Sequence, residues 1–464
     1  MDKKLMIVLL IPLLLFSALP VHADKANEVG YQEESIYYVM VDRFNNGDTS
    51  NDSDVDHTNP LAYHGGDFQG IIDKLDYIKE MGFTSLLLTP IFNNGPDGFN
   101  GNAIENYREI EEHFGTLEVF KKLVNEAHEK DLKIIVDLGL RSAGVNFNET
   151  DMLDVASWWV QETNIDGYKL DLLEEFPTSF LANLVNEVKS EKENFLLIGQ
   201  PYMSEQEAFA VVEEVGIDAI FNFSHAQGIT SFSIPNQSFD IEGKDWNAGT
   251  LPLMVNYMDN PDTVRFTYLS AEENEHPAPR IKLALAYLYT APGIPVVYYG
   301  TEIALNGAEP PANSALMDFR TDQELVEYIT SLAEVRSSVT ALTKGSFELI
   351  KNEDGLLIFK RKHEDQTVFV AINNTTSDQK FTLMRDQLDE NKELKGLITE
   401  DTIRPTDDVF NLVIERDGAQ VYLVQETTQI NYSLFIAVFI VPILMIAFLY
   451  LNKRKHQNNN PKPE

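Results

Sequence analysis

This sequence contains no cysteine and little positive charge. Without cysteine, neither a disulfide framework nor a thiolate metal site can form. The 464 residues include 36 Lys and Arg against 73 Asp and Glu, and the formal net charge is −37. Phosphates would repel such a chain, which argues against nucleic acid as a partner. The acidic excess is typical of a well-solvated surface and is compatible with cation binding.

The N-terminus carries the pattern of an export signal. Lys3 and Lys4 precede an apolar run from Leu5 to Leu19, and Val21-His22-Ala23 is a small-x-small cleavage site. We therefore expect residues 1–23 to be a signal peptide. An uncleaved N-terminal anchor is the alternative, although the run is short for a membrane span.

A second apolar run lies near the C-terminus, at residues 432–451. It has no charge and reaches the roughly 20 residues that a helix needs to cross a bilayer. Because Lys453 and Arg454 follow it, we expect a transmembrane helix, a cytoplasmic basic tail at 452–464 and an extracellular body. A buried core helix is the alternative. Together with the absence of cysteine, these ends predict a single-pass protein of the cell membrane in a Gram-positive bacterium.

Between these ends, short apolar runs alternate with amphipathic stretches such as Leu117–Lys130. The expected strands are 36–41, 85–88, 133–137, 167–171, 195–199, 219–223, 253–257 and 295–299. The alternation predicts parallel βαβ units. Eight strands within about 300 residues favour a closed (β/α)8 TIM barrel over residues 24–343. A doubly wound open sheet is the alternative.

After Thr343 the helical periodicity disappears. Residues 347–350, 356–362, 367–373, 380–383 and 420–424 have the pattern of strands joined by hairpin loops. We therefore expect a C-terminal antiparallel β-sandwich at 344–425 and a linker at 426–431. The predicted fold class is α/β: a TIM barrel, a β-sandwich and one C-terminal transmembrane helix.

Recognisable motifs lie mostly where the expected barrel strands end. They are Asp42-Arg43-Phe44, Thr89-Pro90-Ile91-Phe92, Phe114-Gly115-Thr116, the segment from Asp166 to Asp171, Asp259-Asn260-Pro261-Asp262 and the segment from Gly293 to Glu302. In this order and spacing they resemble glycoside hydrolase family 13, the α-amylase family, over roughly residues 33–425. The resemblance implies retaining hydrolysis or transfer of α-glucosidic bonds, with an α-glucan or a maltooligosaccharide as substrate.

The family's catalytic residues are only partly present. The resemblance places Asp171 at the position of the nucleophile and Asp262 at that of the transition-state stabiliser. The general acid should follow Gly199, where the sequence has Gln200. An amide has no proton to give near neutral pH, and a positioned acid contributes about 10²–10⁴ in rate. The alternative is a displaced acid, with Glu205 or Glu207 supplying the proton.

Other positions depart from the family pattern as well. The family's Arg two residues before the nucleophile is Lys169, which keeps the charge but loses the planar fork that holds a carboxylate. Pro261 replaces a His, and Asn102 replaces the Tyr that stacks on the first sugar. The domain that the family inserts after the third strand is largely missing. The family also has a calcium site between the barrel and this inserted domain. Because Arg141 replaces one of its ligands, we expect this site to be lost.

A second calcium site of the family has its ligands in this sequence. Calcium takes six to eight hard oxygen ligands. The expected ligands of one structural Ca2+ are Asn46, Asp48, Asn51, Asp52, Gly65 and Asp67. A plain turn rich in Asn and Asp is the alternative.

Three functions follow from these observations. The first is an α-amylase-family protein of the cell surface that acts on α-glucans, with hydrolysis weak or lost. The second is an active glycosidase with a displaced acid, whose two carboxyl groups would lie about 5–5.5 Å apart. The third is a non-catalytic, amylase-like module that binds glucan or serves as the partner subunit of a membrane protein.

Overall fold

The computed structural model describes residues 30–95, 98–143, 148–239, 253–320, 323–385, 388, 392–427 and 432–458. The predicted signal peptide, most of the predicted linker and the end of the predicted basic tail lie outside the described residues.

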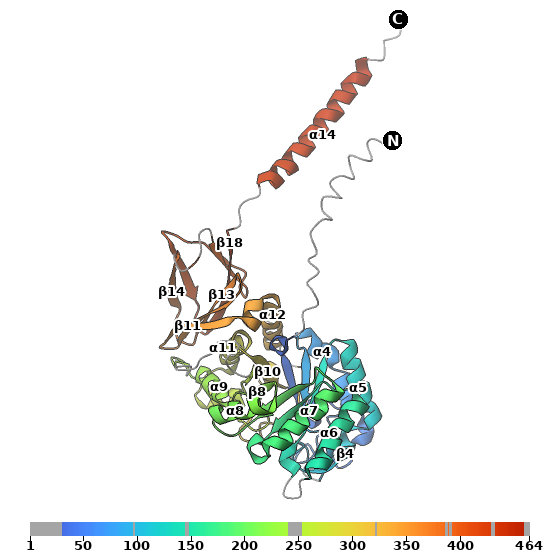
Figure 1. Ribbon diagram of the computed structural model, residues 1–464. Helices are drawn as coiled ribbons and strands as arrows, with labels where there is room; N and C mark the ends of the chain where they lie inside the picture. The colour runs from blue at the N-terminus through green and yellow to red at the C-terminus, as the bar shows by residue number, and fades with distance from the viewer. Residues whose placement is uncertain are drawn as a thin grey trace.

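Eight parallel strands form a closed barrel, which confirms the predicted TIM-barrel fold and excludes an open sheet (Figure 1). The strands are β1 (Ile36–Val39), β2 (Ser85–Leu88), β5 (Lys133–Asp137), β6 (Gly167–Asp171), β7 (Leu196–Gln200), β8 (Ala219–Phe221), β9 (Leu253–Tyr257) and β10 (Ile294–Tyr298). Most strand residues are buried because the strands face packed side chains inside the barrel and helices outside it. Each strand ends within two residues of its predicted end.

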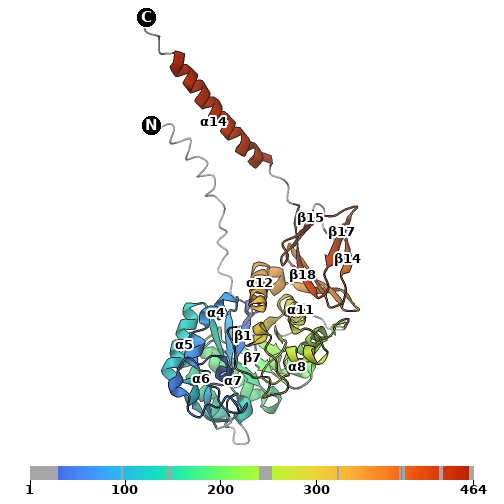
Figure 2. The same ribbon diagram turned by 180° about the vertical axis from the view of Figure 1, so that it is seen from behind.

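Helices surround the barrel (Figure 2). The longer ones are α5 (Leu117–Glu129), α6 (Glu149–Thr163), α7 (Thr178–Glu191), α8 (Glu205–Val215), α11 (Pro277–Thr290) and α12 (Glu324–Ser338). The shorter ones are α2 (Val41–Phe44), α3 (Phe68–Ile72), α4 (Leu75–Glu80), α9 (Phe223–Ile229), α10 (Phe266–Glu272) and α13 (Thr340–Lys344). In α5, Phe120, Leu123, Val124 and Ala127 are buried, and this helical spacing places them on the face that packs on the barrel.

The C-terminal strands form an antiparallel β domain, as predicted. One sheet has the order β11-β12-β13-β18-β15-β16, and β14 pairs with β17 in a second sheet. The bounds are β11 (Ser346–Glu353), β12 (Leu356–His363), β13 (Gln366–Asn373), β14 (Gln379–Met384), β15 (Lys392–Gly396), β16 (Thr402–Ile403), β17 (Val409–Ile414) and β18 (Gly418–Glu426). The sequence analysis did not identify β15, β16 and β17, nor the hairpin β3 (Phe92–Asn94) and β4 (Ile104–Ile110) beside the barrel.

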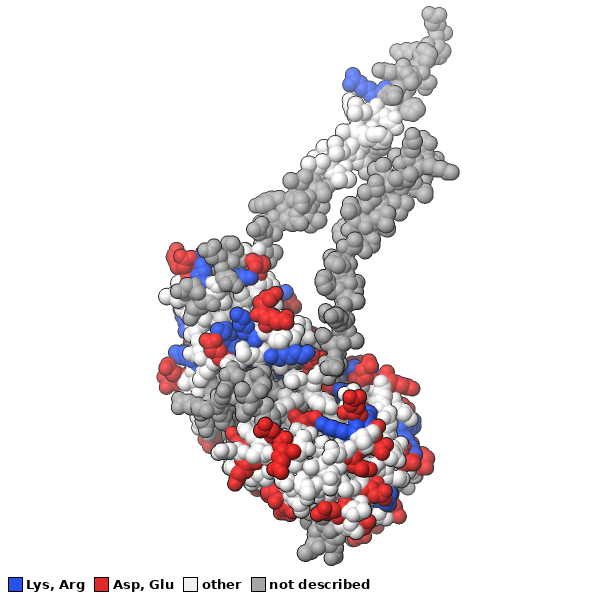
Figure 3. Space-filling view, viewed as in Figure 1, with Lys and Arg blue, Asp and Glu red and all other residues white. Residues whose placement is uncertain are grey.

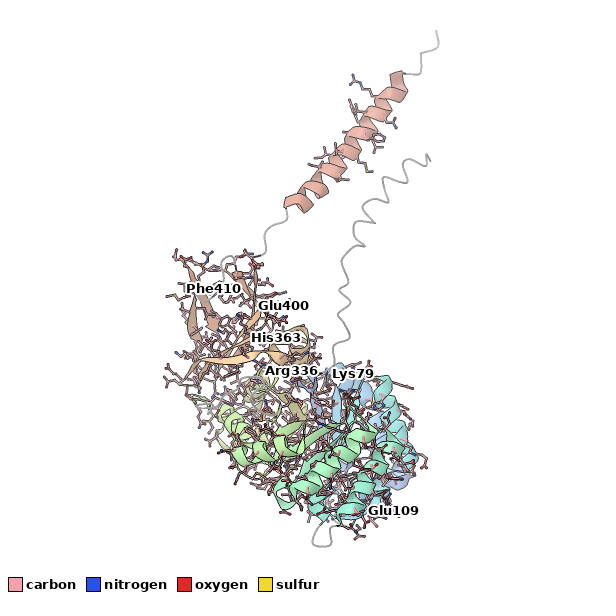
Figure 4. The ribbon with its side chains drawn as sticks, viewed as in Figure 1. Lys79, Glu109, Arg336, His363, Glu400 and Phe410 are labelled. Atoms are coloured by element: carbon pink, nitrogen blue, oxygen red, sulfur yellow. The ribbon has the colours of Figure 1, made fainter. Side chains whose placement is uncertain are left out.

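Both faces of the larger sheet are buried at its strands β12 and β13. In β12, Leu357 and Phe359 belong to the core of the barrel, whereas Leu356 and Ile358 join a smaller core. Phe410 of β17, labelled in Figure 4, belongs to this smaller core. Because successive side chains of a strand point to opposite faces, the sheet packs against the barrel on one face and against the smaller core of the C-terminal domain on the other.

Polar side chains fix the junction between the domains. Asn374 is fully buried, and its amide donates to the carbonyl oxygens of Ser231, Ile234 and Gln237 at 3.2, 3.0 and 3.1 Å. Arg361 of β12 donates to the carbonyl oxygen of Thr290, at the end of α11, at 2.6 Å. Arg336 of α12, labelled in Figure 4, is buried in the same region and donates to backbone carbonyls. The C-terminal domain therefore holds backbone that belongs to the barrel.

Helix α14 (Tyr432–Asn458) covers the predicted transmembrane segment. Its described apolar side chains, from Ile440 to Leu451, are exposed. Over the described part of the chain, no helix is both long and apolar enough to cross a membrane. This finding contradicts the predicted single-pass localisation in the cell membrane with an extracellular body and a cytoplasmic C-terminus.

Candidate functional site

Two predicted catalytic positions, Asp171 and Gln200, lie with Asp137 at the carboxyl ends of neighbouring barrel strands. Asp137 ends β5, Asp171 ends β6 and Gln200 ends β7, and all three side chains are buried. Asp171 and Gln200 are partners in the parallel register of β6 and β7, as Asp137 and Lys169 are between β5 and β6. The carboxyl ends of barrel strands carry the active sites of such folds.

This end of the barrel faces away from the junction with the C-terminal domain. In Figure 4, Glu109 of β4 lies at the opposite end of the barrel from Arg336. The β3–β4 hairpin follows β2 and therefore marks the carboxyl ends of the strands. On the face shown in Figure 3, Asp and Glu are scattered over both domains with Lys and Arg between them. The net negative charge is thus spread over that face.

Lys169 forms a buried ion pair with Asp137. Lys169 Nζ lies 2.6 Å from Asp137 Oδ2, and both side chains are less than a tenth exposed. Burial alone would lower the pKa of Lys169, but the negative charges of Asp137 and Asp171 outweigh it and raise this pKa. Lys169 therefore remains protonated beside Asp171. The sequence analysis placed Lys169 near the site but did not identify Asp137 as its partner.

The backbone turns sharply after Asp171. Leu172 has a φ of +51°, in the left-handed region that bulky residues rarely adopt. Its N–H donates to the carbonyl oxygen of Gln200 at 3.0 Å, which fixes the turn against the end of β7. This contact holds the backbone of the nucleophile position and that of the acid position together.

Gln200 belongs to a hydrogen-bond network that crosses the mouth of the barrel. Its amide Nε2 donates to the hydroxyl oxygen of Tyr202 at 2.6 Å and lies 3.5 Å from Asp262 Oδ2. The Tyr202 hydroxyl donates to Asp262 Oδ2 at 3.0 Å. Asp262 follows β9 in a turn that Asn260 closes by accepting from the Asp262 N–H at 2.8 Å. Tyr202 was not predicted as a site residue, since no motif includes it.

The alternative proton donors of the sequence analysis lie at the start of α8. The Glu207 carboxylate accepts from the backbone N–H of Ser204 at 3.3 Å and from its hydroxyl at 2.5 Å, in a capping box. Glu205 begins the same helix. Glu174, which follows the nucleophile motif, instead accepts from the N–H of Tyr202 at 3.2 Å. Glu207 thus serves the helix start, whereas Glu174 supports the site loop.

The predicted calcium ligands gather in the loop after β1, but not all point to one place. Gly65 has a φ of +86°. A Cβ atom at this position would lie 2.6 Å from the Asn46 amide nitrogen and 2.8 Å from Asp52 Oδ1, so the three residues lie close together. Asp67 caps α3 and accepts from the N–H of Gly47, Asp48 and Gly70, and Asp48 accepts from Ser50.

Asn51 Oδ1 in the same loop is buried without a hydrogen-bond partner. Among the described residues, no three His, Cys, Asp or Glu side chains converge as a metal site. The same loop also holds the Asp52 carboxylate, whose two oxygens accept from the Asn46 amide at 2.9 Å. Amide and carboxylate oxygens are the donor chemistry that calcium takes.

Asp42 holds this loop to the barrel. It is fully buried and accepts from the N–H of His64 at 2.8 Å and of Gly65 at 3.1 Å, beside Arg43. Burial raises the pKa of Asp42 to about 6, against the opposing effects of Arg43 and of these N–H groups.

Comparison with known proteins identifies the family. The model of the α-amylase catalytic domain matches residues 38–148, and the model of the α-amylase C-terminal domain matches residues 345–422. The crystal structure of an α-amylase from Anoxybacillus is 40% identical, with a TM-score of 0.81, and the match covers 87% of this chain and 100% of that one. The chain belongs to the α-amylase family of glycoside hydrolases. The members of this family are enzymes that act on α-glucans.

Two further relatives are similar to this α-amylase-family protein over most of its length. A cyclomaltodextrinase of Thermoanaerobacter pseudethanolicus is 23% identical over 412 residues, which cover 74% of this chain and 70% of the relative. A Beta/alpha-amylase of Paenibacillus polymyxa is 27% identical over 440 residues, covering 81% of this chain. The matched region spans only 36% of that longer relative.

Proposed function

We propose that this protein binds α-glucans or maltooligosaccharides between Asp171 and Asp262 and hydrolyses them slowly. The observation that carries the proposal is the position of Gln200. It ends β7 in register with Asp171, where the family pattern places the general acid. Its amide is engaged with Tyr202 and Asp262 and has no proton to transfer.

The remaining chemistry follows from the residues present. In a retaining reaction, Asp171 attacks the anomeric carbon while an acid protonates the leaving oxygen, and the same acid later activates water. Asp262 would accept sugar hydroxyls and stabilise the positive charge of the transition state. Because Gln200 can neither give nor take a proton, both steps lose their acid–base catalyst. The proposed consequence is hydrolysis that depends on Asp171 but is slow.

The protonated Lys169 has a supporting role in this proposal. Lys169 pairs with Asp137 and also lies close to Asp171. The negative charges of both carboxylates raise the pKa of Lys169. The fixed cation offsets part of the negative charge that Asp137 and Asp171 bring to the strand ends. Lys169 would therefore have a positioning role, without touching the sugar.

We also propose one structural Ca2+ in the loop after β1. Asn46, Asn51, Asp52 and the carbonyl of Gly65 are the residues that would hold it. Support comes from the orphaned Oδ1 of Asn51 and from the closeness of Asn46, Asp52 and Gly65, where the Asn46 amide donates to Asp52 and would have to turn its oxygen toward the ion. Bound calcium would neutralise the carboxylate of Asp52 and fix the loop. Asp48 and Asp67, which the sequence analysis included, serve backbone N–H groups.

The direct test is release of reducing sugar from maltoheptaose by the full protein beside an Asp171→Asn variant. Slow release that disappears in the variant is the expected result. Release at a rate typical of an efficient hydrolase, and dependent on Asp171, would show that another group supplies the proton. The absence of release at high protein concentration, with maltoheptaose still bound, would favour the alternative of a glucan-binding module.

A further inference from the structure

Tyr202 lies where a sugar would bind. Its hydroxyl oxygen contacts the acid position at 2.6 Å and the stabiliser Asp262 at 3.0 Å. In a retaining mechanism of this family, these two positions should contact oxygen atoms of the substrate. The phenol oxygen therefore occupies hydrogen-bonding positions that a glucan needs.

The network requires an amide at position 200. A phenol hydroxyl has one proton to donate, and here the proton goes to Asp262. The Tyr202 oxygen must then accept from its other neighbour, which the Gln200 amide can provide and an ionised Glu cannot. If residue 200 were an ionised carboxylate as well, the single Tyr202 proton could serve either that carboxylate or Asp262, and the other would lack a donor. Gln200 and Tyr202 thus form a matched pair.

A further contact secures the loop that carries Tyr202. The backbone N–H of Tyr202 donates to Glu174 on the turn after β6. Bonds from the loops after β6 and β9 and from the end of β7 therefore converge on this one residue. Tyr202 is nonetheless 46% exposed, so its side chain has room to swing outward.

We propose that Tyr202 is a latch that decides which ligands reach Asp171 and Asp262. Its hydroxyl takes the place of a sugar hydroxyl on Asp262, and a glucan binds only after displacing it. This inference rests on the proposed function, because it assumes that glucan binds at these carboxylates. Gln200 has a positive role in it, as the donor that holds the latch.

The test is the affinity of the full protein for maltoheptaose, measured by calorimetry, in the parent and in Tyr202→Phe. Phenylalanine keeps the ring but cannot bond to Asp262. If about nine molecules in ten are latched, removing the latch tightens Kd about tenfold. The matched control is Tyr268→Phe on α10, because the Tyr268 hydroxyl also bonds to a carboxylate, that of Glu272. The control should leave Kd unchanged.

A double-mutant cycle with Asp262→Ala, which leaves the Tyr202 hydroxyl no acceptor at position 262, separates the latch from a general loosening of the loop. If the latch acts through the Asp262 carboxylate, the tightening seen in Tyr202→Phe disappears in the Asp262→Ala background. Equal tightening in both backgrounds would overturn the proposal, because Tyr202 would then act without Asp262.

The remaining outcomes distinguish the latch from the proposed function. Unchanged or weaker binding by Tyr202→Phe, with clear binding by the parent, would overturn the latch and leave the proposed function standing. Weaker binding would mean that the hydroxyl contacts the sugar. The absence of binding by the parent, Tyr202→Phe and Tyr202→Ala alike would overturn both the proposed function and the latch.

Discussion

Replacing Gln200 by Glu should restore hydrolysis. Gln200 Nε2 lies 3.5 Å from Asp262 Oδ2, so a carboxylate at position 200 would face a second negative charge at a similar distance. With an effective dielectric constant of 20, two such charges repel by about 5 kcal/mol. Because Asp262 is exposed, solvent screens part of this repulsion. The repulsion that remains raises the pKa of the new carboxyl above the usual range of a glutamate.

A carboxyl group with a raised pKa keeps a larger protonated fraction near neutral pH than an ordinary glutamate, so it can donate a proton to the leaving group. A positioned general acid contributes about 10²–10⁴ in rate, which corresponds to about 3–5 kcal/mol of transition-state stabilisation. We expect kcat for maltoheptaose to rise by about that factor in Gln200→Glu. The pH profile should acquire a basic limb near the pKa of the new carboxyl.

The kcat value is the readout, because the same substitution also alters the hydrogen bond to Tyr202. Changes in the latch alter binding and hence KM, whereas proton donation changes the chemical step. Gln200→Met is the matched control, since it also lacks the amide donor but offers no proton. A Gln200→Glu variant that binds maltoheptaose but gains less than tenfold in kcat over Gln200→Met would refute this reasoning. The other altered positions of the pocket would then limit the rate.

Four further predictions test other parts of the structure. Lys169→Met should lower the free energy of unfolding by about 3–5 kcal/mol in urea titrations, because it leaves Asp137 as a buried, unpaired charge. The pKa of Asp42, about 6, lies above its unfolded value, so its contribution to stability is present below pH about 4 and is lost as pH rises to about 6. The loss of stability amounts to about 3 kcal/mol. In Asp42→Asn the free energy of unfolding should depend less on pH when it is measured across that range. Arg361→Met should cost about 1–3 kcal/mol, since it leaves buried carbonyl oxygens without a donor, and a Tm equal to that of the parent would contradict this assignment. Calcium should raise Tm by binding the loop from Asn46 to Asp52, and chelator should reverse the shift; an unchanged Tm at millimolar calcium would exclude the site.

The barrel could be predicted from the sequence because its strands leave a strong local pattern. Parallel strands are buried on both faces, so β5 and β10 stand out as unbroken apolar runs between amphipathic helices. In β17 the burial alternates with exposure, and β16 has only two residues, so neither gives a comparable signal. The apolar run near the C-terminus was interpreted from its length and flanking charges, and the finding on helix length over the described residues contradicts that interpretation.

The positions of Asp171, Gln200 and Lys169 could be predicted because each lies at or near a strand end. Their partners could not. Asp137 reaches Lys169 across 32 residues, and Tyr202 reaches Asp262 across 60. Such contacts depend on which strands become neighbours and on the path of the loops between them. A residue such as Tyr202, which lies in no motif, becomes visible only when the loop ends meet.

The three bonds that the Asn374 amide makes bear on how the protein can be dissected. They tie Ser231, Ile234 and Gln237 to a residue that lies more than a hundred positions further along the chain. Cutting the gene after the last barrel helix would delete Asn374 and leave those carbonyl oxygens facing solvent at a newly bared apolar surface. We therefore expect proteases to cleave the barrel expressed alone first in the segment that contains Ser231, Ile234 and Gln237. The smallest piece worth purifying is one that keeps both domains.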